Sequence, residues 1–410
     1  MPDAPSSPFG PDIRLLAAAP HRFLFFVGAT NIVMAMLWWT LWLLDARYQW
    51  FGLAQPAIPA GWMHAIVMQY QVLSPFIFGF LLTVFPRWLS LPALGRWHYV
   101  PVGIGLLGGQ LLTLAGLFGV PHLLYPGILL TTAGWMAGLA FLLQLLANEK
   151  QITWHAVSCA GALLLGLTGL LLVLAYGWFG NAMLMFAAIK FGSFGFLLPI
   201  YFTVCHRMLP FFASAVIPGY TMVRPFWALA LFWILILAHL ALELAHGYAW
   251  LWLPDIALAA LTAFLLSRWW PKQAKSPALL RVLLFGFSWL PISMALYAIQ
   301  SLWFSSTGEF ILGRAPAHAL FIGYFGSLLV AMVTRVTQGH SGRPLELGKV
   351  AAFAFIVIQI VAMLRVLAEL TSNSLFWQCI AAVLWLCAFL PWVVRSSWIY
   401  LTPRVDGQPG

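Results

Sequence analysis

Ionisable side chains inside long apolar segments are the residues of this sequence best placed to do chemistry, because such groups are costly in lipid and usually functional. Histidine is the most informative type, since a neutral imidazole binds haem iron or copper. His64 and His318 lie near the start of two apolar segments, and His206 and His340 lie at the end of two. Pairing by depth predicts one metal site between His64 and His318 and a second between His206 and His340.

Lys190 belongs to the same expected level as His64 and His318. It lies about two helical turns into an apolar segment and has no local partner. An uncompensated ammonium there would cost several kcal/mol or lose its proton. A carboxylate from elsewhere, such as Glu243 or a cofactor carboxylate, must therefore neutralise it, and we expect Lys190 to line the site of His64 and His318.

The stretch HLALELAH places His239, Glu243 and His246 at i, i+4 and i+7, which is one face of a helix. Helical bundles present Glu and His to metals at such spacings, so these residues form a third candidate metal site. The alternative is a polar stripe near the lipid headgroups with Glu243 and His246 in water. Arg365 and Glu369 form an i, i+4 pair that accounts for both residues.

The composition identifies the elements that must position these residues. The chain of 410 residues is 63% hydrophobic and only 7% charged, whereas about a quarter of the residues in a soluble domain are charged. A helix needs roughly 20 apolar residues to cross a bilayer. The sequence predicts an all-α, polytopic membrane protein with about twelve spans: 23–44, 64–85, 100–119, 123–147, 154–176, 183–205, 226–246, 250–268, 281–304, 316–338, 350–370 and 376–394.

The number of spans is either twelve or eleven, because Pro254 and Asp255 interrupt the eighth segment. With the N-terminus inside, sixteen of the 20 Lys and Arg residues fall in inner segments, which predicts that both termini are cytoplasmic. We therefore expect a cytoplasmic tail over 1–22, a single transmembrane domain over 23–394 and a second cytoplasmic tail over 395–410.

Several classes of function are excluded by the same inspection. The net charge of +10 is spread singly between apolar spans, so membrane topology explains it better than nucleic-acid binding. The four cysteines lie in apolar spans without a CxxC motif, which argues against a disulfide framework or a zinc cage. No Walker loop, dinucleotide motif or catalytic-triad spacing is present, and the catalytic residues stay unassigned.

The segment HALFIGYFGSLLVAMVTRVTQGHSGRPLE, which begins at His318, closely resembles the NnrS family, down to its Gly-His-x-Gly-Arg-Pro-Leu ending. GFLLTVFPRW (79–88) and CHRMLPFF (205–212) resemble two further family segments. The resemblance implies a haem- and copper-containing bacterial membrane protein linked to nitric oxide, nitrosative stress and denitrification. Haem b is then the expected cofactor, copper a possible second metal, nitric oxide the expected ligand, and the electron donor is unknown.

One family motif is altered in this chain. The family commonly opens the second span with Trp-His-Ala-His-Glu-Met, whereas this chain reads WMHAIVM from Trp62. One histidine, His64, is kept, and the second histidine and the glutamate are replaced. A metal site held by those groups elsewhere in the family is missing or rebuilt here, and the His239, Glu243 and His246 stripe is the candidate for a rebuilt site.

Arginines accompany the predicted pair of His206 and His340. Arg207 follows the first histidine, and Arg335 and Arg343 flank the second. Guanidinium groups bind carboxylates in bidentate fashion, so this arrangement suits the propionates of a haem. The alternative is a glycine helix cap with ordinary cytoplasmic arginines, which gives His340 no role.

Two classes of function stay open from the sequence. In the first, a haem or haem and copper protein binds or reduces nitric oxide as an oxidoreductase. In the second, a transporter or sensor carries haem as a structural group or as cargo, and Pro75 and Pro199 within spans suit moving parts.

Overall fold

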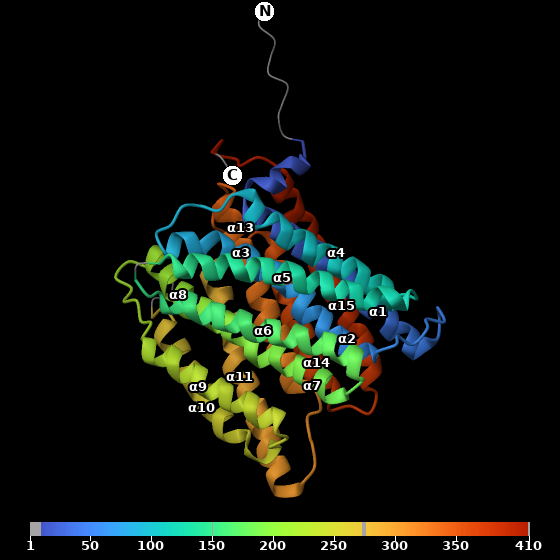
Figure 1. Cartoon of the computed structure of the whole chain (residues 1–410). Helices are drawn as coiled ribbons and strands as arrows, with labels where there is room; N and C mark the ends of the chain where they lie inside the picture. The colour runs from blue at the N-terminus through green and yellow to red at the C-terminus, as the bar shows by residue number, and fades with distance from the viewer. Residues whose placement is uncertain (1–9, 150, 273–275, 409–410) are drawn as a thin grey trace, which may run out of the picture.

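A computed structural model describes residues 10–149, 151–272 and 276–408, and every regular element in these ranges is a helix (Figure 1). This agrees with the predicted all-α class. Residues 1–9 and 409–410 of the predicted tails, together with the predicted inner residues Lys150 and Lys275, lie outside the described residues.

The described helices form twelve rods in three successive units of four. The first unit contains α1 (Pro20–Tyr48), the composite rod α2–η2–α3 (Ala60–Ile66, Val67–Val72, Leu73–Trp88), α4 (Val100–Leu117) and α5 (Leu124–Ala147). The second contains α6 (Trp154–Phe179), α7–η5–α8 (Ala182–Lys190, Phe191–Leu197, Leu198–Val216), α9 (Phe226–Leu244) and α10 (Trp252–Trp269). The third contains α11 (Ala278–Thr307), α12–η7–α13 (Ala315–His318, Ala319–Gly326, Ser327–His340), α14 (Lys349–Ala368) and α15 (Ser374–Leu401).

The three units close into a ring. The last rod of each unit packs against the first rod of the next, as α5 does on α6, α10 on α11 and α15 on α1. Within each unit the first rod packs on the second and the third packs on the fourth. The composite second rods of the first and third units are the most buried of the apolar rods, so the core is built around them.

Each second rod is interrupted by a π-helical segment, namely η2, η5 and η7. Backbone groups at bilayer depth must be satisfied within the protein, so such an interruption needs neighbours that supply hydrogen bonds. Tyr70 of η2 donates its hydroxyl to the carbonyl of Ala188 at 2.7 Å. Ser193 of η5 donates to the carbonyl of Ile189 at 2.9 Å. The interruptions are thus supported by side chains of the central rods themselves.

Eleven of the rods are long and apolar enough to cross a membrane. The structure therefore supports the prediction of a polytopic membrane protein. The rod that does not meet this criterion is α10, the interrupted eighth segment of the sequence analysis. It is nevertheless a continuous 18-residue helix that packs on both α9 and α11.

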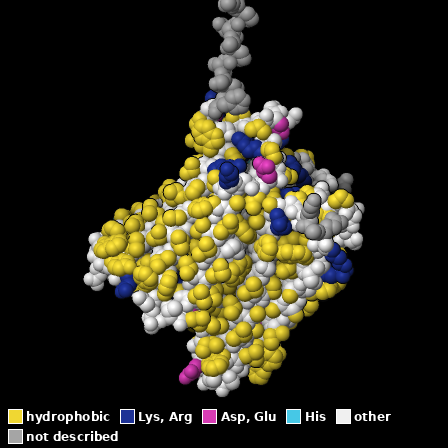
Figure 2. Space-filling model, turned by 180° about the vertical axis from the view of Figure 1, so that it is seen from behind, with side chains coloured by type: hydrophobic (Ala, Val, Ile, Leu, Met, Phe, Trp, Pro, Cys, Tyr) yellow, Lys and Arg dark blue, Asp and Glu magenta, His cyan; other side chains and the backbone are white. Residues whose placement is uncertain are grey.

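Both ends of the described chain lie at one end of the bundle, called here the terminal end (Figure 1). The backbone N–H of Asp12 donates to the carbonyl of Leu401 at 2.8 Å. Arg22 donates one guanidinium nitrogen to the carbonyls of Tyr400 and Thr402, both at 2.9 Å. Figure 2 shows an apolar belt over the body of the molecule, with most Lys and Arg side chains on that face near the terminal end.

The contact between α4 and α5 provides a test of the packing. A Cβ atom at Gly105 would lie 2.6 Å from the Cα atom of Gly134, so Gly105→Ala must push two backbones apart. We expect this change to destabilise the protein by about 1–3 kcal/mol and to lower the thermal unfolding midpoint in detergent.

Gly161→Ala in α6 is the matched control, because a Cβ atom there meets no atom within 4 Å. Alanine is also the better helix former, so this control should keep or raise the midpoint. Equal midpoints for the two variants would contradict the close α4–α5 packing.

Candidate ligand-binding site

A cavity of about 380 Å³, called here the polar cavity, lies between the central rods. It brings together three residues that the sequence analysis expected at one level, His64, Lys190 and His318. Arg314 and Arg365 also face it. Much of the remaining wall is aromatic, with contributions from Trp39, Phe194, Phe321, Trp385 and Phe389.

The three expected residues occupy similar places in the three units. Lys190 and His318 are the last residues before η5 and η7, and His64 lies three residues before η2. All three π segments contribute to the wall of the polar cavity, through Met68, Gln69, Val72, Ser193, Phe194, Phe321, Ile322 and Gly326. π-Helical turns are rare and frequently mark functional sites. The backbone irregularities and the ionisable residues therefore point to the same cavity.

His318 is held in one tautomer by the backbone. Its Nδ1 lies 2.9 Å from the carbonyl oxygen of Arg314, which can only accept, so Nδ1 carries the proton and Nε2 keeps a lone pair. Nη2 of Arg365 lies 3.3 and 3.2 Å from the two ring nitrogens and donates to Glu369 at 3.1 Å. Nη1 of Arg365 is buried and has no hydrogen-bond partner among the described residues. The Nε2 lone pair of His318 thus accepts from Nη2 of Arg365, while Nη1 of the same guanidinium remains an unsatisfied donor beside the cavity.

His64 is oriented by stacking. Its ring lies 4.1 Å from that of Trp39 with an interplanar angle of 10°. Trp39 in turn stacks on Trp42 at 5.3 Å, so α1 fixes the position of the His64 ring.

Lys190 is neutralised by Glu243 of α9, with 2.7 Å between Nζ and Oε1. The lysine side chain is 21% exposed and that of the glutamate 5%. This was one of the two partners expected from the sequence. The seventh span therefore contributes to the site through an ion pair, since α9 has no residue in the cavity wall.

The predicted metal-binding face of His239, Glu243 and His246 is not formed. Helix α9 ends at Leu244, and His246 has left-handed backbone with φ 54°. Nδ1 of His246 lies 2.7 Å from the hydroxyl of Tyr248. Nδ1 of His239 lies 2.6 Å from Asp255 of α10. Across the described ranges, no group of three or more His, Cys, Asp or Glu side chains is arranged to hold a metal ion.

His206 and His340 do not pair with each other as predicted, because each contacts a different histidine. Nδ1 of His206 lies 3.0 Å from Nε2 of His155, and its Nε2 lies 3.2 Å from the carbonyl of Pro225. The ring of His340 lies 4.3 Å from the ring of His21 at the start of α1. Equal depth placed the two residues at the same end of the bundle but did not determine the direction in which each side chain points.

The arginines expected around that pair are also separated. The guanidinium of Arg207 lies over the ring of Trp88 at 4.4 Å, and that of Arg335 lies over Phe212 at 4.0 Å. Arg343 is partly buried, and burial lowers its pKa from the ordinary value. Cation–π contacts with aromatic rings therefore account for two of the three arginines.

The end of α13 binds the C-terminal segment. The backbone N–H of Val405 donates to the carbonyl of Ser341 at 3.1 Å. Gly342 has φ +71°, and a Cβ atom there would lie 2.6 Å from Cγ of Asp406. Hydrogen bonds from Arg404 lower the pKa of Asp406 to about 2, so this carboxylate is ionised at neutral pH. Left-handed Gly342 thus shapes the turn after α13, and the ring of His340 is tilted by 36° against that of His21.

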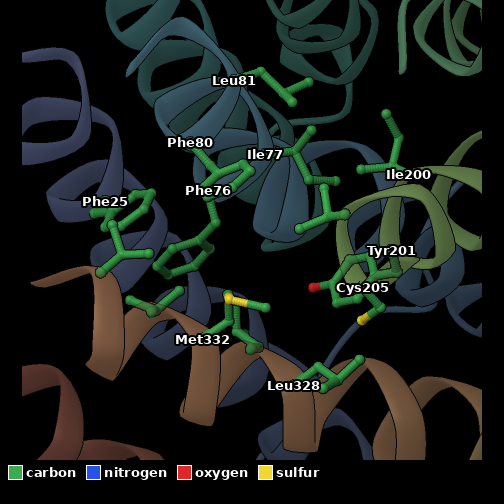
Figure 3. Close-up of a pocket in the computed structure, with 14 residues that line it drawn as sticks. Phe25, Phe76, Ile77, Phe80, Leu81, Ile200, Tyr201, Cys205, Leu328 and Met332 are labelled. Carbon is green, nitrogen blue, oxygen red and sulfur yellow. The ribbon is translucent and has the colours of Figure 1, made fainter. Parts of the chain in front are cut away.

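A second, smaller space, called here the apolar pocket, has a volume of about 60 Å³ and lies between α1, α3, α8 and α13 (Figure 3). Figure 3 shows Phe76, Ile77, Tyr201 and Met332 around it. Leu329 belongs to the walls of both the apolar pocket and the polar cavity. The two spaces are therefore neighbours along the axis of α13.

A family model described as NnrS protein matches residues 15–404, which is nearly the whole chain. The chain belongs to the NnrS family. This agrees with the resemblance seen in the sequence motifs. No curated protein matches the chain.

Two residues in the wall of the polar cavity, Arg365 and Trp39, were not recognised from the sequence. Arg365 was explained by its pairing with Glu369, yet it also contacts His318. Outside the wall, Asp255 was noted only as an interruption of the eighth segment, although an aspartate within an apolar segment is itself a signal of function. Trp39 lies in a Trp-rich segment of α1 whose composition does not distinguish a ring facing a ligand from one facing lipid.

The turn after α13 gives a local prediction. Gly342→Ala introduces a side chain at a left-handed position and against Asp406, so we expect the C-terminal segment to detach from α13. Limited proteolysis should then cleave the segment after α15 faster than in the unsubstituted protein. Gly339→Ala, whose nearest atom would be 3.8 Å away, should leave the cleavage rate unchanged.

The ion pair beside the polar cavity gives a second prediction. Lys190→Met leaves Glu243 buried without its cation, and breaking such a pair costs about 3–5 kcal/mol. Glu243→Gln should cost less, because the lysine is partly exposed and water can solvate its charge. The double variant should recover a large part of the loss in denaturation measurements in detergent, whereas additive losses would show that the two charges do not interact.

Proposed function

We propose that this NnrS protein binds haem in the polar cavity and binds nitric oxide there. The observation that carries the proposal is His318, whose Nδ1 donates to a backbone carbonyl and thereby leaves the Nε2 lone pair as an acceptor at the polar cavity. Nη2 of Arg365 lies 3.2 Å from Nε2, and an iron ion bound there would take the place of that contact. Metal-binding histidines commonly donate their other ring nitrogen to a backbone carbonyl in this way.

The residues of the polar cavity suit a haem in three respects. Its volume of about 380 Å³ falls within the range of about 300–1,000 Å³ that is typical of small-molecule sites. Its aromatic walls suit a flat macrocycle. Arg314, Arg365 and Lys190 provide cationic groups for propionates, and Arg365 has a buried donor without a partner in the described part of the chain. His64 offers a second imidazole.

The number of metal-binding side chains at the polar cavity favours haem over a copper ion held by the protein alone. A macrocycle already supplies four nitrogen ligands, so one or two histidines from the protein complete the coordination of its iron. A copper ion held by the protein alone needs three or so side chains, and the described residues contain no such group. Copper stays a prediction from the family resemblance.

Haem supplies an iron that can bind nitric oxide, and the chain's own groups determine how that iron is held. Arg314 fixes the tautomer of His318, and Trp39 fixes the ring of His64. His318 would hold the haem iron either alone, which would let the iron bind nitric oxide, or together with His64. Binding of nitric oxide, with or without its reduction, would protect a cell from nitrosative stress.

We also infer the orientation in the membrane. The basic residues near the terminal end support a cytoplasmic position for that end by the positive-inside rule. The polar cavity would then lie toward the outer face of a bacterial inner membrane. Both described ends of the chain lie at the terminal end of the bundle, which requires an even number of membrane crossings. We therefore count α10, the eighth rod, as a crossing in addition to the eleven candidate spans. Its 18 residues span about 27 Å at about 1.5 Å per residue.

A transporter is the second candidate function, and one observation favours it. The polar cavity and the apolar pocket share Leu329, and the central rods that form both spaces are interrupted helices. Interrupted helices around a central site are a feature of secondary transporters. In that case haem would be structural or the cargo.

We expect the purified protein to be red, with a reduced Soret band that shifts on addition of nitric oxide. His318→Ala should remove the haem absorbance or change its spin state, because it deletes the proposed iron ligand. Absorption spectra of the reduced and oxidised protein, together with metal analysis, provide the measurement.

His122→Ala is the control, since this histidine lies in the short connection η4 (Pro121–Leu123) at the protein surface, and its spectrum should be unaltered. An unaltered spectrum in both variants would show that His318 is not a ligand. A colourless protein that retains its thermal transition would support the transporter.

A further inference from the structure

Four ionisable side chains form a continuous buried series that begins at the polar cavity. Nζ of Lys190, which lines the cavity, is 2.7 Å from Oε1 of Glu243. The same Oε1 is 3.7 Å from Nε2 of His239, and Nδ1 of His239 is 2.6 Å from Oδ1 of Asp255. The series joins α7, α9 and α10. The side chains of His239 and Asp255 have no exposed surface, and that of Glu243 is 5% exposed.

The charges of these groups balance only when one further proton is bound. Lys190, Glu243 and Asp255 in their ionised forms sum to a single negative charge, which is costly to bury without a partner. A proton shared by His239 and Asp255 makes the group neutral. The proton can move from His239 only to the neighbouring carboxylates Glu243 and Asp255, because aromatic rings enclose the imidazole, Phe194 at 4.0 Å and Tyr297 at 5.6 Å between ring centroids.

The unsatisfied atoms of the series lie where a proton would move. Nε2 of His239 and Oδ2 of Asp255 are buried without a hydrogen-bond partner among the described residues. Nε2 faces Glu243 at a distance too long for a hydrogen bond but short enough for an ion pair. A network built only for stability would satisfy these atoms, since a buried unpaired polar group is destabilising.

We propose that Lys190, Glu243, His239 and Asp255 form a proton relay that supplies the polar cavity. The ammonium of Lys190 gives a proton to a nitrogen oxide bound in the cavity and becomes an amine. The imidazolium of His239 then passes its Nε2 proton to Glu243, which returns a proton to Lys190. His239 ends neutral and still donates from Nδ1 to Asp255.

The net result is the transfer of one proton from the His239–Asp255 pair to the cavity, which leaves the four groups with one negative charge. They regain neutrality by taking a proton from water at the end of α9, where Glu243 precedes the last helical residue Leu244. Proton-carrying series of Asp, Glu and His are a recurrent use of buried ionisable residues in membrane proteins.

This role rests on the proposed function for its acceptor. Reduction of nitric oxide to nitrous oxide takes up one electron and one proton for each nitric oxide, and a one-electron donor must supply the electron. The shared proton of His239 and Asp255, however, can be examined without haem or nitric oxide.

The first measurement is infrared spectroscopy of the full-length protein in detergent. In His239→Gln the remaining negative charge should be neutralised by protonation of Asp255, so a protonated-carboxyl band should appear. The band should be missing from the double variant with Asp255→Asn. Absence of the band from His239→Gln would overturn the shared proton, provided that the variant keeps its thermal transition.

The second measurement is nitric oxide consumption by the reduced protein. His239→Gln and Asp255→Asn should each slow it by about 100-fold, the lower range for proton transfer by a positioned group, without a change in the haem spectrum. His246→Gln is the matched control, because His246 lies on the same segment outside the series, and its rate should equal that of the unsubstituted protein. Unchanged rates in His239→Gln and Asp255→Asn would overturn the relay. If the unsubstituted protein contains no haem, the proposed function is overturned instead. The infrared measurement then decides on its own whether His239 and Asp255 share a proton.

Discussion

Backbone hydrogen bonding at bilayer depth is the constraint on which this structure depends. Lipid offers no donor or acceptor, so a rod can leave regular α-helical pairing only where neighbouring rods supply partners. The three interrupted rods therefore have to lie where other rods cover their irregular turns, as η2 and η5 do for each other and α11 and α14 do for η7. Tyr70 of η2, for example, reaches the carbonyl of Ala188 just before η5. The same requirement that buries the irregular turns also creates the space between them.

The threefold arrangement explains how unlike residues come to share one cavity. Each unit contributes its second rod to the centre, and each of these rods carries an ionisable residue just before its π segment. Similar positions in the three units hold different chemistry, namely two imidazoles and one ammonium. The ring closure by α15 on α1 brings the third of these positions next to the first. An asymmetric site is thus assembled from similar structural units.

The sequence was sufficient for the rods and for His64, Lys190 and His318 of the polar cavity, because apolar length and an ionisable residue within an apolar segment are strong one-dimensional signals. It was insufficient where direction around a helix axis matters. His206 and His340 share a depth but turn toward His155 and His21. His246 fell outside the expected face because its left-handed backbone ends α9 earlier than the apolar pattern suggests. The π segments have a similar apolar composition to the helices around them, so the sequence pattern did not predict them.

The two spaces on either side of Leu329 differ in what they can admit. The polar cavity contains cationic and imidazole groups, whereas the apolar pocket is lined by aliphatic and aromatic side chains, Tyr201 and Cys205 among them. Moving an ion through the second space would require desolvation in a low-dielectric wall, which costs several kcal/mol per charge. A small uncharged molecule such as nitric oxide meets no comparable barrier. A proton needed in the polar cavity is better supplied by another path, and we propose that the buried series that ends at Lys190 provides one from the side of α9 and α10.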